Sequence, residues 1–105
     1  MKPALNVVYR NLDHSPTLDQ QIDKGVGKLT RFSQHIITGR VVLDSPHQHK
    51  HKGKLYRASL ELDVQGQMLS LAQNDESIHV ALRDLFKTAE RKVKEVEAKH
   101  RRLRH

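Results

Sequence analysis

Hydrophobic positions recur with two different periods along this chain, which separates predicted helices from predicted strands. In residues 77–102 apolar side chains return every three or four positions, so they form one stripe of a long helix. Asn74 or Asp75 is the predicted cap of this helix. The stripe consists of Ile78, Leu82, Leu85, Ala89, Val93 and Val96.

A second helical stripe lies nearer the N-terminus. Ser15 and Pro16 suit a helix start, because a side-chain cap precedes a residue whose missing N–H costs nothing there. Thr17 with Gln20 offers an alternative capping box. The helix is predicted to end near residues 33–35. Its apolar positions are Leu18, Ile22, Val26, Leu29 and Phe32.

Alternation with a period of two predicts four short strands. Gln65-Gly66 is a tight turn signal, and residues 47–53 form a polar, basic hairpin tip. The predicted order is therefore β-α-β-β-β-α, an α+β fold with a four-stranded sheet and two helices packed on one face. Residues 1–105 are predicted to form one domain with a loose tail after about residue 101. The strands are predicted at residues 5–10, 36–44, 55–64 and 68–72.

Composition excludes several classes of protein. The 105 residues contain no cysteine, which excludes disulfides, thiolate chemistry and cysteine zinc sites. No apolar run approaches the roughly 18 residues of a membrane span, and the N-terminus lacks the apolar region of a signal peptide. No catalytic triad, phosphate loop or carboxylate pair is visible. We expect a cytoplasmic protein without enzymatic activity, cofactor, small-molecule substrate or membrane partner.

The formal net charge is +7, and the positive charge is unevenly distributed. Residues 83–105 carry nine Lys/Arg against four Asp/Glu, whereas residues 58–82 carry four acids and no Lys/Arg. Uneven positive charge favours a polyanion such as nucleic acid, although it also occurs on surfaces that only aid solubility. On the long helix the cations are spaced roughly 6 Å apart along one face. They are Arg83, Lys87, Arg91 and Lys94.

This spacing is close to that of successive phosphates, so the stripe favours contacts with a nucleic-acid backbone. The chain has only four Phe and Tyr residues and no Trp, and Tyr9, Phe32 and Phe86 are predicted to lie in the core, so nothing indicates base reading. Tyr56 beside Arg57 has two interpretations, stacking on a nucleotide or covering the edge of the core. We therefore expect recognition of structured RNA through its shape and backbone, as in double-stranded-RNA binders. A solvated basic face is the alternative interpretation.

The predicted hairpin tip combines histidines and lysines. His47, His49 and His51 alternate, so an extended strand would place them on one side, where three imidazoles can bind Zn²⁺, Cu²⁺ or Ni²⁺. Neighbouring lysines oppose a cation, and no carboxylate supports the imidazoles. We therefore favour an RNA-contacting loop over a metal site, and a simple polar loop is the remaining interpretation. The lysines predicted to bind rRNA here are Lys50 and Lys52 in the tip and Lys54 directly after it.

An ordered set of short motifs resembles one known family. These are Ser15-Pro-Thr-Leu18, Lys28-Leu-Thr-Arg31, Val41-Val-Leu43, Gly53-Lys-Leu-Tyr-Arg57, Glu76-Ser-Ile-His-Val-Ala-Leu-Arg83 and Ala89-Glu-Arg-Lys-Val93. They resemble the short form of the ribosome hibernation-promoting factors, also called protein Y, ribosome-associated inhibitors or sigma-54 modulation proteins.

The resemblance implies a fold similar to double-stranded-RNA-binding domains and a non-enzymatic function. It implies binding to the small ribosomal subunit in the channel for mRNA and tRNA, where such proteins block initiation and stabilise idle ribosomes during stress or stationary phase. By position, the rRNA-binding residues would be Lys28, Arg31, Lys87, Arg91, Lys92 and Lys94.

The chain also departs from that family. Gly25 stands where many members have Lys, His79 stands where many have Tyr, and the long C-terminal extension that dimerises ribosomes is missing. We expect a monomer off the ribosome and no direct ribosome dimerisation. Gly25 and Gly27 each weaken the first helix by up to about 1 kcal/mol, and close packing against the sheet or a partner is one explanation. A generic structured-RNA-binding or regulatory module, a sigma-factor role included, and a metal-binding protein remain the alternatives.

Overall fold

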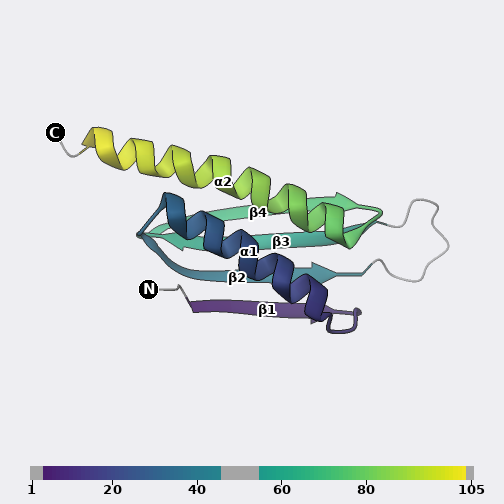
Figure 1. Ribbon diagram of the computed structural model, residues 1–105. Coiled ribbons are helices and arrows are strands. Elements are labelled where there is room, and N and C mark those ends of the chain that lie inside the picture. Colours follow the sequence, from purple (N-terminus) through teal and green to yellow (C-terminus); the bar gives the residue numbers. More distant parts are fainter. Residues whose placement is uncertain (1–3, 46–54, 104–105) are drawn as a thin grey trace.

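The computed structural model describes residues 4–45 and 55–103 and confirms the predicted α+β fold (Figure 1). One four-stranded sheet, in the order β1-β2-β3-β4, is covered on one face by two helices. The helices share this face because each has one apolar stripe to bury. The elements are β1 Ala4–Arg10, α1 Pro16–Phe32, β2 Ile36–Asp44, β3 Tyr56–Val64, β4 Gln67–Asp75 and α2 Ile78–Leu103.

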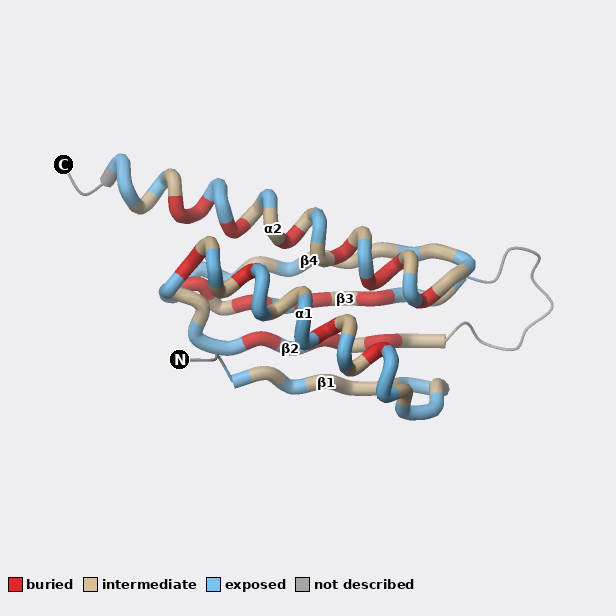
Figure 2. Tube along the Cα trace, viewed as in Figure 1, coloured by how far each residue is buried: buried red, intermediate tan, exposed pale blue. Residues whose placement is uncertain are grey.

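The sheet is mixed. β1 pairs with β2 in parallel and α1 makes the crossover between them, whereas β2, β3 and β4 pair antiparallel. Val7 lies opposite Val41, and Val41 lies opposite Leu60, so these apolar residues form one row beneath the helices. Figure 2 shows the buried positions on the facing sides of sheet and helices. The predicted period-two alternation is thereby confirmed in β2 and β3.

The structure confirms the predicted cap of the first helix and not that of the second. Ser15 caps α1, as predicted, by accepting a hydrogen bond from the Leu18 N–H at 3.3 Å. The predicted cap of α2 was wrong, because Ser77 takes that role and accepts from the Val80 N–H at 3.3 Å. β4 pairs with β3 as far as Asp75, three residues beyond its predicted end. Asn74 is therefore still in the sheet, and the Asp75 carboxylate accepts from the Ser77 N–H at 2.8 Å.

Tyr9 joins the end of β1 to the start of α1. Its hydroxyl lies 2.7 Å from Asp19 Oδ1 and 3.1 Å from the Ser15 carbonyl oxygen, and His14 contacts the other Asp19 oxygen. Burial, together with the Asp19 hydrogen bond and charge, raises the pKa of Tyr9 to about 12. The phenol therefore stays protonated, and it fixes the first turn of α1 over the sheet.

The structure explains one of the two glycines in α1. A Cβ built on Gly25 would lie 2.6–2.7 Å from three ring atoms of Phe86 on α2, so the ring needs a residue without a side chain. Gly27 has nothing within 4 Å of such an atom. Gly25 is therefore closely packed, but against α2 and not against the sheet, and the structure offers no reason for Gly27.

This contrast predicts opposite effects of two similar substitutions. Gly25→Ala is expected to lower the free energy of unfolding by about 1–2 kcal/mol, because overpacking outweighs the gain in helix propensity. Gly27→Ala is expected to raise it by up to about 1 kcal/mol, because only the propensity changes. Urea unfolding followed by circular dichroism measures both. Stabilisation by Gly25→Ala would contradict the close contact with Phe86.

Candidate nucleic-acid interface

The two helices lie side by side over the sheet and run in the same direction (Figure 1). Successive residues of α1 contact successive residues of α2, from the N-terminal part of both helices towards the C-terminal part. At one end, Gln21 Nε2 donates to the His79 carbonyl at 2.8 Å, and His79 Nδ1 lies 3.0 Å from Gln21 Oε1. Further along, the paired residues are Gly25 with Phe86, Lys28 with Glu90, and Phe32 with Lys94. These contacts set which cations of one helix face those of the other.

Glu90 organises the cations at the centre of this surface. Its carboxylate lies 3.2 Å from Lys28 Nζ on α1 and 3.2 Å from Lys94 Nζ on α2. The hydrogen bond from Lys28, followed by that from Lys94, holds the pKa of Glu90 below its ordinary value. Lys94 Nζ also lies 4.2 Å from the centre of the Phe32 ring. Two lysines from different helices are thus held beside one carboxylate.

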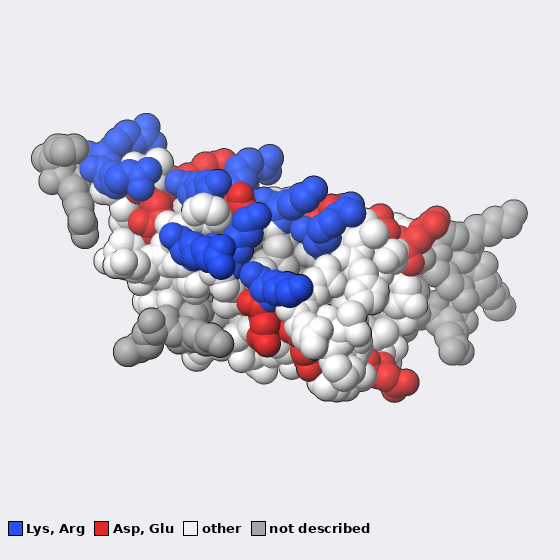
Figure 3. Space-filling view, in the orientation of Figure 1, with Lys and Arg blue, Asp and Glu red and all other residues white. Residues whose placement is uncertain are grey.

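Three further cations surround this pair and lack such a partner. Arg31 is exposed and follows Lys28 by three residues, so it lies on the same side of α1. Lys87 and Arg91 are exposed on α2. No ion pair is formed by these three side chains within residues 4–45 and 55–103. We call Lys28, Arg31, Lys87, Arg91 and Lys94 the helix-face cluster, and Figure 3 shows Lys and Arg gathered along this face.

The structure separates the remaining predicted residues from this cluster. Lys92 lies on the other flank of α2, where it lines a hollow beside β4 with Met68 and Lys99. Its Nζ lies 3.8 Å from Glu95 Oε1. The other predicted positions lie outside the described residues: Lys50, Lys52 and Lys54, and the weak metal candidates His47, His49 and His51.

The described residues contain neither a metal-ligand cluster nor a membrane-spanning helix. No cluster of three or more His, Cys, Asp or Glu side chains there is arranged to bind a metal ion. Neither described helix combines the length and the hydropathy that crossing a bilayer requires.

A hollow of about 220 Å³ lies within the interface, between α1 and α2. Phe86 and Leu29 form its apolar part, and Lys28, Arg83 and Lys87 stand around it. Sequence reasoning placed Arg83 in the basic stripe and Phe86 in the core, and it missed the hollow. The sequence signal for the hollow was Gly25, but its significance depends on which residue of α2 lies opposite this glycine.

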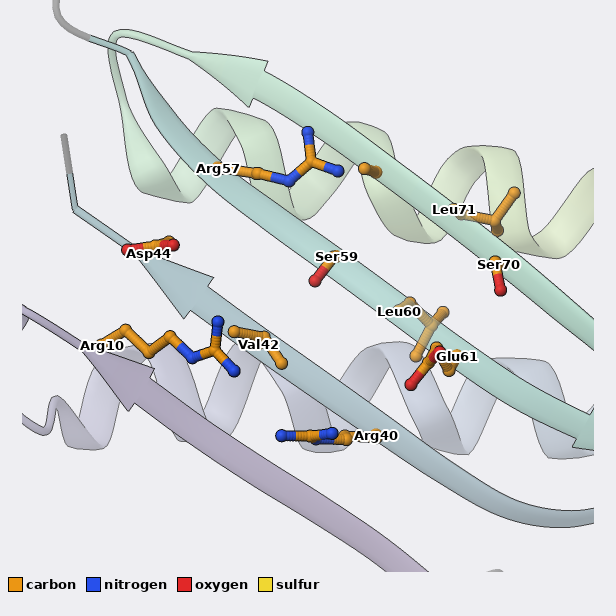
Figure 4. A pocket seen from close by; sticks show the side chains of 11 residues that line it. Arg10, Arg40, Val42, Asp44, Arg57, Ser59, Leu60, Glu61, Ser70 and Leu71 are labelled. Carbon is orange, nitrogen blue, oxygen red and sulfur yellow. The ribbon is translucent and has the colours of Figure 1, made fainter.

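The other face of the sheet is also hollowed, but acidic side chains there offset most of the positive charge (Figure 4). Arg10, Arg40 and Arg57 line a hollow of about 410 Å³ together with Asp44 and Glu61. The register places Arg40 opposite Glu61, and Asp44 between Arg10 and Arg57. Because each arginine has a cross-strand acidic neighbour, this face attracts a polyanion less than the helix face does.

Known proteins share this fold. The family described as "Sigma 54 modulation protein / S30EA ribosomal protein" matches residues 5–101. No curated protein sequence matches significantly. The structure is similar to the Thermus thermophilus Protein Y N-terminal domain, with a TM-score of 0.74 and 22% identity over 91% of this chain and 99% of that chain. It is also similar to a ribosomal subunit interface protein from Coxiella burnetii, with a TM-score of 0.72 and 13% identity over 90% and 98% of the two chains. The family match covers nearly the whole chain, and the chain therefore belongs to the sigma 54 modulation protein / S30EA ribosomal protein family.

Proposed function

We propose that this protein binds the small ribosomal subunit by placing the helix-face cluster on the phosphates of ribosomal RNA. It would occupy the channel for mRNA and tRNA and inhibit initiation during stress or stationary phase, in the cytoplasm and without catalysis. The observation that carries the proposal is the cluster itself. Five exposed cations from two helices share one face, while the three arginines on the opposite face of the sheet stand beside two carboxylates.

The family match supports a ribosomal partner, and the name of the Coxiella burnetii protein describes it as a subunit interface protein. The physical argument is independent of both. Each phosphate that a Lys or Arg neutralises releases condensed counterions, so several cations on one face produce strong binding at low salt. Their number and spacing suit a structured RNA backbone better than a small acidic ligand.

Sedimentation with purified small subunits tests this proposal. The wild-type protein is expected to travel with the subunit in a sucrose gradient at low salt, and the Lys87→Glu/Arg91→Glu/Lys94→Glu variant is expected to remain at the top. The matched control is Arg10→Glu/Arg40→Glu/Arg57→Glu, which makes the same change in net charge on the open face of the sheet. Circular dichroism checks that both variants fold.

The outcomes separate the hypotheses. Equal loss of binding in both variants would mean that net charge, and not the helix face, determines binding. Failure of the wild type to co-sediment at low salt would contradict the ribosomal proposal. Comparable affinity for free duplex RNA would favour a generic structured-RNA binder. Displacement of the bound protein by mRNA with initiator tRNA would support a site in the channel.

A further inference from the structure

We propose that the hollow between α1 and α2 binds one unpaired base of an RNA, while Lys28, Arg83 and Lys87 hold the phosphates on either side of that base. This inference rests on the proposed function, since it names the feature of RNA that the helix face would bind. It adds an unpaired nucleotide to what the sequence predicted, which was contact with the backbone alone.

The first argument is the position of Phe86. Its ring lies against the backbone of Gly25, where any side chain would collide with it, so the ring is held at the junction of the helices. Phe86 is only partly buried and lines the hollow together with Leu29. An aromatic ring at the wall of an open apolar hollow gives a planar base a surface for stacking.

The second argument is charge. An apolar hollow on a protein surface can accept many ligands, but three cations stand around this one. Glu90 also lines it and pairs with Lys28 and Lys94, and Arg83 Nε lies 3.2 Å from Asp84 Oδ1. Lys28 and Arg83 would exchange these carboxylates for phosphates, whereas Lys87 has no acidic partner among the described residues. A nucleotide within an RNA strand has a backbone phosphate on each side, so its base can occupy the apolar hollow while the phosphates contact the cations around it. An apolar peptide side chain would satisfy only the hollow.

The third argument concerns specificity. Gln21 is the neutral side chain at the hollow that could read a base edge, but both ends of its amide are engaged by His79. Few hydrogen-bonding groups are therefore free to distinguish one base from another. Stacking is tolerant of sequence, because every base has a π face. We infer a preference for an unpaired nucleotide with little preference for its identity.

The test uses two RNA hairpins that differ only by one unpaired adenosine in the stem. The wild-type protein is expected to bind the bulged hairpin about tenfold more tightly than the perfect one, as measured by fluorescence anisotropy. Phe86→Leu is expected to abolish this preference while leaving affinity for the perfect hairpin unchanged. Phe86→Tyr, which keeps the aromatic ring, is expected to retain it. With 2-aminopurine in the bulge, fluorescence should fall on binding to wild type and not on binding to Phe86→Leu.

Circular dichroism shows whether Phe86→Leu folds. If it does not, Arg83→Gln changes an exposed residue and is expected to weaken binding of the bulged hairpin more than the perfect one. Equal affinity of wild type for both hairpins would overturn the inference and leave the proposed function standing. Co-sedimentation of wild type with small subunits, without binding to either hairpin, would also overturn the inference alone. Loss of both kinds of binding would overturn both, and a preference that survives in Phe86→Leu would overturn the role of Phe86.

Discussion

Binding of the protein to small ribosomal subunits is expected to weaken by about 10²–10³ when KCl is raised from about 50 mM to about 200 mM. The helix-face cluster contributes five cations, and each neutralised phosphate adds about −0.9 to the slope of log affinity against log salt. Filter binding over a series of KCl concentrations measures this slope. A slope near zero would contradict backbone recognition.

Single substitutions of different cations are expected to change this salt slope by different amounts. Lys87→Gln is expected to reduce its magnitude by about one, because the structure gives Lys87 no acidic partner among the described residues. Lys28→Gln is expected to reduce it less, since Lys28 must first leave Glu90 to neutralise a phosphate. Arg40→Gln on the open face of the sheet is the control and should leave the slope unchanged. An equal effect of all three would show that the charge acts without a defined docking face.

Replacing Glu97 by alanine is expected to lower the free energy of unfolding by about 2–3 kcal/mol, as expected for loss of a buried, hydrogen-bonded charged group. Glu97 is the one charged residue that is buried in the described chain, at 9% exposure. Its Oε2 accepts a hydrogen bond from the Ser33 hydroxyl and lies 2.8 Å from His35 Nδ1. The His100 ring stacks on His35 with ring centres 5.7 Å apart. Glu97 thus joins α2 to the end of α1 and the start of β2.

The control for this substitution is Glu95→Ala, two residues away on the same helix. Glu95 is exposed and its single ion pair is long, so its removal is expected to change stability by less than about 0.5 kcal/mol. Urea unfolding at neutral pH compares the two variants. Equal effects would show that the Glu97 contacts do not hold the ends of the helices together.

The contribution of Glu97 should also depend on pH. Burial alone would raise the pKa of Glu97, but hydrogen bonds from Ser33 and His35 and the charges of His35 and His100 hold it below its ordinary value. A group with a lowered folded-state pKa stabilises the protein above its unfolded-state pKa, which is about 4.3 for Glu. The difference in stability between wild type and Glu97→Gln is therefore expected at neutral pH and should shrink as the pH falls below about 4. A difference that grows in acid would contradict this sign.

Much of the fold was predictable because it depends on local patterns. The period of the apolar positions separates helices from strands, and a sheet with one apolar face requires both helices on that face. Ser15 could be recognised because a cap depends on the next three residues alone. The cap of α2 could not, since it depends on where β4 ends. β4 continues to Asp75 because its hydrogen bonds with β3 outweigh the weak strand propensity of Asn74 and Asp75.

The candidate site likewise has features that follow from one segment and features that depend on residues distant in sequence. The stripe of Lys87, Arg91 and Lys94 follows from the helical period within one segment. Lys92 is one residue from Arg91, and the roughly 100° between successive residues places it on another flank. The burial of Glu97 could not be predicted, because its partners Ser33 and His35 are distant in sequence.

The sequence by itself determined the order of the elements, the apolar face of each and the sign of the charge on α2, because these depend on spacing within single segments. Only the tertiary structure decided which cations of α1 stand beside those of α2, and that a hollow separates them. Residues of two helices meet only once their packing is set, and here Gly25 against Phe86, Lys28 with Glu90, and Ser33 with Glu97 set it.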